Sequence, residues 1–147
     1  MMTATPSAES KTSTPMKIKL ESVSISDVDK ALAFYVEVLG FVKKRDMPLG
    51  DARLVTVVSA DEPDGAELLL EPNGEHPATR TYKRALYDEG IPLTAFLVDN
   101  VESEYARLKA QGVSFRAEPA LCNGAMTAVL DDTCGNLIMI YQAADEQ

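Results

Sequence analysis

The sequence predicts an α+β fold built from two tandem βαβββ modules whose sheets curl around a shared cleft. The order strand, helix, strand, strand, strand occurs twice along the chain. In both copies 13 residues separate an aspartate that can begin the helix from a glycine that can end it, Asp27 and Gly40 first, then Asp99 and Gly112. The 147 residues, 46% of them hydrophobic, suffice for one domain with a real core, and each half needs the other to bury its sheet.

The first copy begins with an extended run over residues 18–25, in which apolar and polar side chains partly alternate. Asp27 is a good N-cap for the next helix, because its carboxylate can accept hydrogen bonds from free backbone N–H groups. Apolar residues then recur at helical spacing, and Gly40 permits a left-handed C-cap. Three strands are expected after the helix, at residues 41–44, 52–59 and 67–71.

The second copy follows a connector that is expected to contain a helix within residues 75–90. The pattern then predicts a strand at 93–98 and a helix at 101–110 with Asp99 as its N-cap. Strands are expected at residues 113–117, 125–131 and 136–142.

We therefore expect a single domain over residues 16–143. It divides into module one at 16–74, the connector at 75–91 and module two at 92–143. The Ser-, Thr- and Pro-rich residues 1–15 are predicted to form a flexible tail, because they carry too few large apolar side chains to offset their ordering entropy. Residues 144–147 are the C-terminal tail.

The charge balance excludes two classes of partner. The formal net charge is −9, whereas a protein that binds nucleic acid or an anionic membrane needs an excess of Lys and Arg. No apolar run reaches the roughly 20 residues that cross a bilayer, and the N-terminal residues lack the apolar centre of a signal peptide. We expect a cytoplasmic protein, in which Cys122 and Cys134 stay reduced because their spacing fits neither a disulfide framework nor a metal knuckle.

Several motifs resemble those of the vicinal oxygen chelate superfamily, also called the glyoxalase, bleomycin resistance and dioxygenase superfamily, over roughly residues 16–143. The motifs are residues 26–35, 39–41, 98–101, 112–113 and 131–136. They cap and pack helices or form turns, so they are structural and touch no substrate. The resemblance implies the paired-module fold, and it implies a homodimer because the family commonly pairs its modules across subunits.

The resemblance also implies where a metal would be held. Metal-dependent members carry a histidine on the first strand and a carboxylate on the last strand of each module. Counting from the helix caps and the last glycine, these positions are Leu20 and Leu69 in the first module and Leu93 and Met139 in the second. Leucine has no lone pair, and a thioether suits copper(I) rather than the divalent ions of this family. Because His76 is also the only histidine, we expect no metal and no cofactor.

Strand alternation predicts the wall of the cleft. The residues expected on it are Leu20, Ser22, Leu69, Leu93, Ala95, Leu137, Met139 and Tyr141. This mostly apolar wall with a few hydroxyls is typical of a small-molecule site. Periodicity alone does not separate an open cleft from a filled core.

Candidate acid or base groups are Glu67, Glu71 and Tyr141, since alternation places the two glutamates on the same face as Leu69. Both glutamates are also expected near strand ends, where solvent normally reaches them. Glu21 is expected to point away from the cleft, but a shift of one residue would turn it inward and supply a metal ligand.

The connector carries the remaining polar candidates. His76 lies in a loop-like setting, either simply exposed or at the mouth of the cleft. Arg80, Lys83 and Arg84 form a basic spot in an acidic protein, either a solvated helix face or a contact for an anionic ligand.

These patterns leave two main classes of function. The first is a metal-free member of the family that binds or sequesters a small, partly hydrophobic molecule. The alternative is an enzyme of the lyase or dioxygenase type that uses a non-standard metal site or metal-free carboxylates. A structural role with a filled cleft is a third interpretation.

Overall fold

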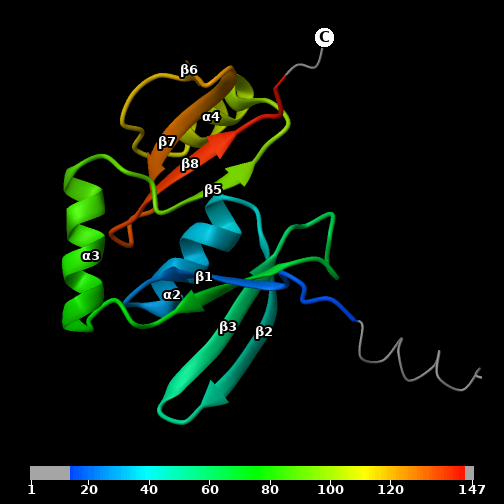
Figure 1. Cartoon of the computed structure of the whole chain (residues 1–147), viewed down its shortest axis with the longest axis vertical. Coiled ribbons are helices and arrows are strands. Elements are labelled where there is room, and N and C mark those ends of the chain that lie inside the picture. The colour runs from blue at the N-terminus through cyan, green and yellow to red at the C-terminus, as the bar shows by residue number, and fades with distance from the viewer. Residues whose placement is uncertain (1–13, 145–147) are drawn as a thin grey trace, which may run out of the picture.

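The computed structural model describes residues 14–144 and contains two four-stranded sheets, one above the other in Figure 1. The first sheet has the strand order β1-β4-β3-β2, in which only the β1–β4 pair is parallel. The elements of the first module are β1 (Leu20–Ser24), α2 (Val28–Leu32), η1 (Ala33–Val38), β2 (Val42–Leu49), β3 (Ala52–Val58) and β4 (Glu67–Glu71).

The second sheet repeats this topology with the strand order β5-β8-β7-β6. Its parallel pair is β5–β8, which corresponds to β1–β4. After the connecting helix α3 (Pro77–Asp88), the elements are β5 (Thr94–Leu97), α4 (Val101–Ala110), β6 (Ala120–Cys122), β7 (Ala125–Asp131) and β8 (Leu137–Tyr141). The predicted α+β fold with two tandem βαβββ modules is confirmed. None of the helices within residues 14–144 is long and apolar enough to cross a lipid bilayer.

The first module's helix begins at the predicted cap. The Asp27 carboxylate accepts a hydrogen bond from the backbone N–H of Lys30 at 3.1 Å, and α2 continues directly into the π-helical turns of η1. Phe34 and Tyr35 are both buried in η1. Gly40 has a φ of +96°, a conformation that side chains rarely adopt, so a glycine is needed to end this helix.

Three local predictions differ from the structure. The N-cap of α4 is Asn100, not Asp99, because the Asn100 side chain accepts the hydrogen bond from Ser103 N at 2.8 Å. Residues 113–117 form only a single bridge, Phe115 to Leu130, and the strand paired with β7 is the later and shorter β6. Strand β2 runs on to Leu49 rather than ending at residue 44. Figure 1 shows the β2–β3 hairpin projecting from the body of the fold.

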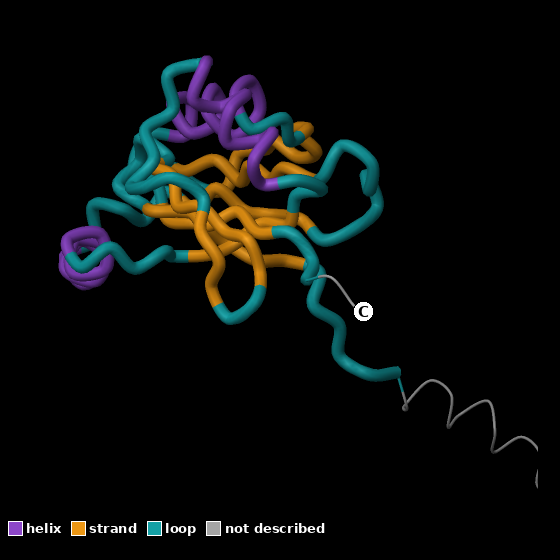
Figure 2. The backbone as a smooth tube through the Cα atoms, turned by 90° about the horizontal axis from the view of Figure 1, so that it is seen from above, coloured by secondary structure: helices purple, strands orange, loops and turns teal. Residues whose placement is uncertain are grey.

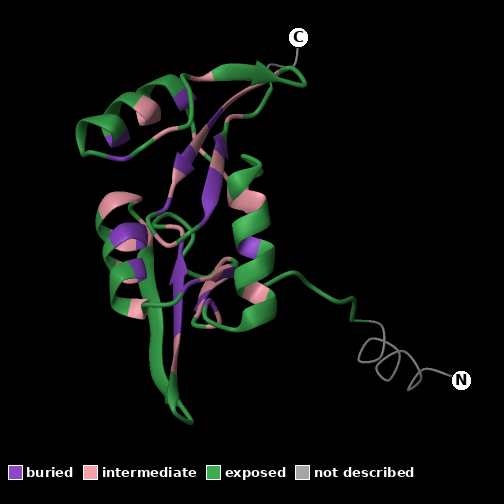
Figure 3. Cartoon of the chain, turned by 90° about the vertical axis from the view of Figure 1, so that its left-hand side faces the viewer, coloured by how far each residue is buried: buried purple, intermediate pink, exposed green. Residues whose placement is uncertain are grey.

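The hydrophobic core lies between the sheets and the helices of the two modules. Val23 and Ile25 at the end of β1 are fully buried, as are Leu130 on β7 and Ile138 on β8. These residues belong to one continuous cluster that both modules share. Figure 3 shows buried strands between helices whose outer surfaces are exposed. Neither module would bury its sheet by itself, as the duplicated pattern predicts.

Buried hydrogen bonds join the two modules. The Tyr35 hydroxyl of η1 donates to Asp132 Oδ2 at 2.5 Å, and Asn136 Nδ2 donates to the same oxygen at 2.9 Å. Asn136 Nδ2 also donates to the backbone oxygen of Ser24 at 2.8 Å. The Lys83 ammonium on α3 donates to the backbone oxygens of Ser24 and Cys134, both at 2.9 Å. Through these two bonds Lys83 links the connecting helix α3 to both modules. Figure 2 shows this helix end-on at the edge of the molecule.

Candidate functional site

The strand register defines an open face on each sheet, meaning the face turned away from α2, η1 and α4. On the first sheet Ser22 pairs with Leu69, and Leu69 pairs with Thr56. On the second sheet Ala95 pairs with Met139. Paired residues in neighbouring strands point to the same side. By this register Leu20, Ser22 and Leu69 lie on the open face of the first sheet, and Ala95, Met139 and Tyr141 on that of the second. Leu93 lies before β5 and packs against the core.

These open faces expose apolar side chains. The relative exposures are 58% for Leu20, 62% for Leu97 and 37% for Tyr141. Leu137, in contrast, is only 1% exposed, so its side chain packs inside the protein and a ligand does not reach it. Large apolar side chains gathered on an exposed sheet face are typical of a surface that another molecule covers, so this surface is a candidate for binding a ligand or a second subunit.

A cavity of about 500 Å³ lies where the two open faces meet helix α3. We call it the junction cavity. It is lined by Glu21, Ser22, Ser24, Glu71, Asn73, Ala78, Thr79, Tyr82, Lys83, Leu93 and Thr94. Of the expected wall residues, Ser22 and Leu93 line it and the other six do not.

The junction cavity contains polar atoms that lack partners. Ser24 Oγ and Asn73 Oδ1 are both buried, and neither has a hydrogen-bond partner within residues 14–144. Leaving such atoms unsatisfied costs roughly 1–3 kcal/mol each. Glu71, also on the lining, has no side-chain hydrogen bond or ion pair within the same residues. The Glu71 carboxylate therefore offers acceptor oxygens to a ligand that brings N–H or O–H donors, whereas Ser24 Oγ and Asn73 Oδ1 are covered by neighbouring atoms.

Glu67 lies on the same face as Glu71, but its carboxylate is already bound by neighbouring side chains. Arg45 binds its carboxylate through two nitrogens at 2.8 and 3.0 Å, and the Thr56 hydroxyl donates to it at 2.8 Å. The Arg45 hydrogen bond, followed by that of Thr56, lowers the pKa of Glu67 from 4.5 to about 2. A carboxylate with so low a pKa is a poor proton acceptor at neutral pH.

The residues at the metal-ligand positions that the family resemblance implies do not fit a divalent ion. Leu20, Leu69 and Leu93 offer no donor atom, and Met139 offers only a thioether. Within residues 14–144 no group of three or more His, Cys, Asp or Glu side chains could hold a metal ion. Glu21 pairs with Leu68, which packs against the core, so its side chain starts from the opposite side of the sheet to Leu20. Because β1 is an edge strand, Glu21 nevertheless lines the junction cavity together with Glu71, contrary to the expectation that it points away from the cleft.

The remaining polar candidates have structural surroundings. His76 is the N-cap of α3, where its Nδ1 accepts a hydrogen bond from Ala78 N at 3.1 Å. Cys122 is exposed. Burial, followed by the charge of Asp132, raises the pKa of the Cys134 thiol to about 11, which makes this cysteine a weak nucleophile. Tyr141 is exposed at the end of β8 and lies outside the junction cavity.

Sequence reasoning missed the function of Lys83 and the contribution of the unpartnered Ser24 and Asn73. Lys83 is 8% exposed, and burial lowers the pKa of its ammonium group. Its helical position and neighbouring arginines indicate an exposed basic face, and the two carbonyl oxygens that hold it come from segments distant in sequence. No local pattern reveals such contacts.

Paired βαβββ modules with apolar open faces beside a small cavity are the architecture of a two-module glyoxalase-type protein. The chain belongs to the Glyoxalase/Bleomycin resistance protein/Dioxygenase superfamily, whose sequence profile matches residues 18–140. It is 52% identical over 127 residues to the uncharacterized protein YurT of Bacillus subtilis (strain 168), covering 86% of this chain and 99% of that one.

Two solved structures are also similar to this chain. UcmS2 is 30% identical with a TM-score of 0.73, and the match covers 87% of this chain and 98% of UcmS2. TnmS3, an antibiotic binding protein from Streptomyces sp. CB03234, is 27% identical with a TM-score of 0.69, over 88% of this chain and 98% of TnmS3.

Proposed function

We propose that this protein binds a small, partly hydrophobic molecule on its open sheet faces and in the junction cavity without using a metal ion. The observation that carries the proposal is the chemistry of the family's four metal-ligand positions, which hold Leu20, Leu69, Leu93 and Met139. These four side chains add apolar surface on or beside the sheet face where metal-dependent members of the family place their metal ligands. Apolar walls with a few polar groups are the usual make-up of a small-molecule site.

The polar lining indicates the kind of molecule. Glu71, Ser24 Oγ and Asn73 Oδ1 are acceptors without partners in residues 14–144. A ligand with an apolar body and an amine, amide or hydroxyl group would pair with the Glu71 carboxylate while covering Leu20 and Leu93. Similarity to the antibiotic binding protein TnmS3 supports this interpretation.

The test is a titration with metal-free bleomycin, an amphipathic molecule rich in N–H donors, in buffer containing EDTA. A ligand that binds only the folded state raises its stability by about 2.7 kcal/mol at a concentration of 100 Kd, so thermal unfolding and calorimetry report binding. We expect Leu20→Lys and Glu71→Gln each to weaken it. Leu121→Lys is the matched control, because Leu121 is 70% exposed on β6 but pairs with Met126, which packs against the core.

If bleomycin fails to bind, a panel of aromatic antibiotics extends the same experiment. If Leu20→Lys and Leu121→Lys lower the affinity equally, the ligand binds at a site other than the open sheet faces and the junction cavity. Binding that requires an added divalent ion would contradict the metal-free proposal.

We also propose that the protein forms a homodimer in the cytoplasm, as the family resemblance implies. The exposed side chains of Leu97 and Tyr141 support the dimer, since a second copy would remove them from water. Analytical ultracentrifugation tests it: a dimer is expected, weakened by Leu97→Lys more than by Leu121→Lys. A monomer at all concentrations would refute it.

A metal-free enzyme is the second candidate, and Glu71 favours it. Its carboxylate lines the junction cavity beside Ser22 and Ser24 and has no partner in residues 14–144, so it is available to take a proton from a bound molecule. If the protein transforms its ligand, Glu71→Gln should abolish turnover even at ligand concentrations that saturate the weakened binding site. Unchanged turnover in this variant would remove Glu71 as the base.

A further inference from the structure

A second and larger cavity lies on the other side of Lys83 from the junction cavity. Its volume is about 1060 Å³, and residues of η1, α3, the segment after α4 and the β7–β8 turn enclose it. We call it the polar cavity. Lys83 lines both cavities, while the sheet positions Leu20, Leu69, Leu93 and Met139 are absent from the polar cavity. The polar cavity is thus distinct from the site proposed above, so a ligand could bind in it whether or not the open sheet faces bind one.

Four cationic side chains line this cavity, and two of them have no partner among the residues that the structure describes. Lys30, Arg80, Lys83 and Arg84 line it in a protein whose net charge is −9. Within residues 14–144 neither the Lys30 ammonium nor the Arg84 guanidinium has a hydrogen-bond or ion-pair partner. Arg80 is held only loosely, at 4.0 Å from Glu75.

Two of the three acidic side chains on the lining are engaged by other groups. Asp131 accepts hydrogen bonds from the Tyr87 hydroxyl and from Thr133 N. Glu75 accepts one from the Ser26 hydroxyl at 2.7 Å. Asp88 is the third, and it is exposed at the end of α3. The lining thus carries four cationic and three acidic side chains, which leaves a small excess of positive charge.

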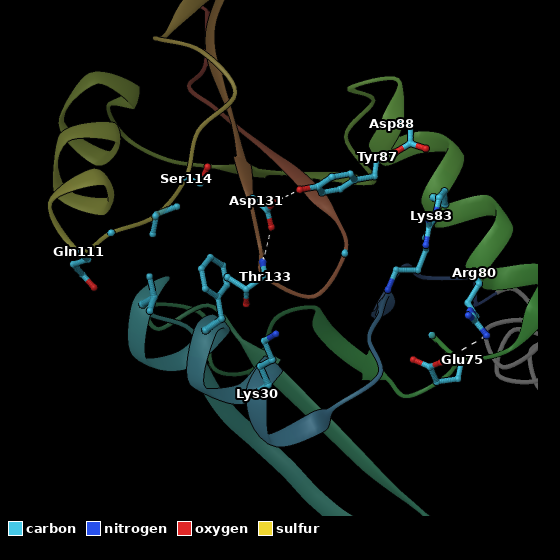
Figure 4. Close-up of a pocket in the computed structure, with 17 residues that line it drawn as sticks. Lys30, Glu75, Arg80, Lys83, Tyr87, Asp88, Gln111, Ser114, Asp131 and Thr133 are labelled. Atoms are coloured by element: carbon cyan, nitrogen blue, oxygen red, sulfur yellow. Dashed lines mark hydrogen bonds and ion pairs between the residues drawn. The ribbon is translucent and has the colours of Figure 1, made fainter.

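Hydroxyl groups and apolar side chains complete the lining. Figure 4 shows Lys30 rising from α2 toward Thr133, with Tyr87 and Asp131 joined above them and Ser114 on the opposite wall. Phe34 and Val113 supply apolar wall. An anionic group beside Lys30 could also accept from the Thr133 hydroxyl, and the apolar part of the same molecule would contact these walls.

We propose that the polar cavity is a binding site for a small organic anion, a molecule with a phosphate or carboxylate group on an apolar body, held by Lys30 and Arg84. Charge-assisted hydrogen bonds from ammonium and guanidinium groups favour such anions. The open volume accommodates a molecule of this size.

The experiment titrates ¹⁵N-labelled protein with phenyl phosphate, benzoate and inorganic phosphate, each at constant ionic strength set with sodium chloride. We expect saturable shifts of the amide signals of Thr133, Ser114 and Gly112 with phenyl phosphate. Shifts with benzoate as well would assign the site to carboxylates and phosphates alike, whereas shifts with phenyl phosphate alone would assign it to phosphate esters. Inorganic phosphate lacks the apolar body and should bind more weakly.

Two substitutions separate this site from general attraction of anions. Lys30→Ala and Arg84→Ala should each weaken phenyl phosphate about tenfold, as expected for the loss of a charge-assisted contact. Both positions are exposed on helices, where alanine is well tolerated. Lys17→Ala removes an exposed charge from the segment before β1 and should change nothing, as should Leu20→Lys in the other site. Absence of saturable shifts with any probe, or equal weakening by Lys17→Ala and Lys30→Ala, would overturn the proposal.

Discussion

Replacing Tyr35 by phenylalanine tests the junction between the two modules. Burial, followed by the adjacent Asp132 carboxylate, holds the pKa of Tyr35 well above its ordinary value, so its hydroxyl remains a proton donor. That hydroxyl donates to Asp132 at 2.5 Å, and both residues are fully buried. Asp132 keeps three other donated hydrogen bonds, from Cys134 N and from the backbone and side chain of Asn136. The substitution therefore removes one of four bonds to a buried carboxylate.

The expected loss is about 2 kcal/mol, because hydrogen bonds to charged groups contribute roughly 1.5–3 kcal/mol and a buried partner is left short of a donor. For a protein of this size such a loss lowers the melting temperature by about 6 °C. Urea unfolding followed by circular dichroism measures the free energy directly.

Tyr82→Phe is the matched control, since Tyr82 is exposed on α3 and its change should stay within about 0.5 kcal/mol of wild type. Equal stabilities of the Tyr35→Phe and Tyr82→Phe variants would show that the Tyr35 hydroxyl does not stabilise the junction. In a double-mutant cycle, Tyr35→Phe and Asn136→Ala should be non-additive because both side chains bind Asp132.

Three further predictions concern individual side chains. Arg45→Met should return the pKa of Glu67 from about 2 toward 4.5, which ¹³C carboxyl titration would measure. A depressed carboxylate pKa stabilises the fold above pH 4.5, and this stabilisation is lost as the pH falls toward 2. In acid unfolding the variant should therefore lose stability less steeply than wild type between pH 4.5 and 2. A thiol reagent at pH 8 should label Cys122 rapidly and Cys134 slowly, so Cys122→Ser should abolish the fast phase of labelling. A fast phase that persists in this variant would contradict the burial of Cys134. His76→Ala should cost about 1 kcal/mol of stability through loss of the α3 cap, whereas His76→Asp should retain it.

Much of the fold follows from local chemistry in the sequence. Residues 101–110 and 125–131 are predicted and observed with the same bounds, because their helical and alternating patterns are regular. Alternation also assigns Leu20 and Met139 to the open faces, since one buried face fixes the register of each strand.

The errors occur where a strand has no buried face or a contact spans the chain. All eight residues of β2 are exposed, so its far end lacks the alternating pattern that marks a strand. Phe115 alternates with polar neighbours but forms only one bridge before Pro119. The bond from Tyr35 to Asp132 joins residues 97 positions apart, and the unpartnered oxygens of Ser24 and Asn73 are buried by contacts that no local pattern reveals.

The metal content of the purified protein decides between metal-free binding and a metal-dependent enzyme. Protein incubated with nickel, zinc and manganese ions, passed through a desalting column and analysed by plasma mass spectrometry should retain far less than one ion per chain, because Leu20, Leu69, Leu93 and Met139 offer these ions no suitable donor. One tightly held ion per chain, lost on Glu21→Gln or Glu71→Gln, would contradict metal-free binding and restore a metal-dependent enzyme.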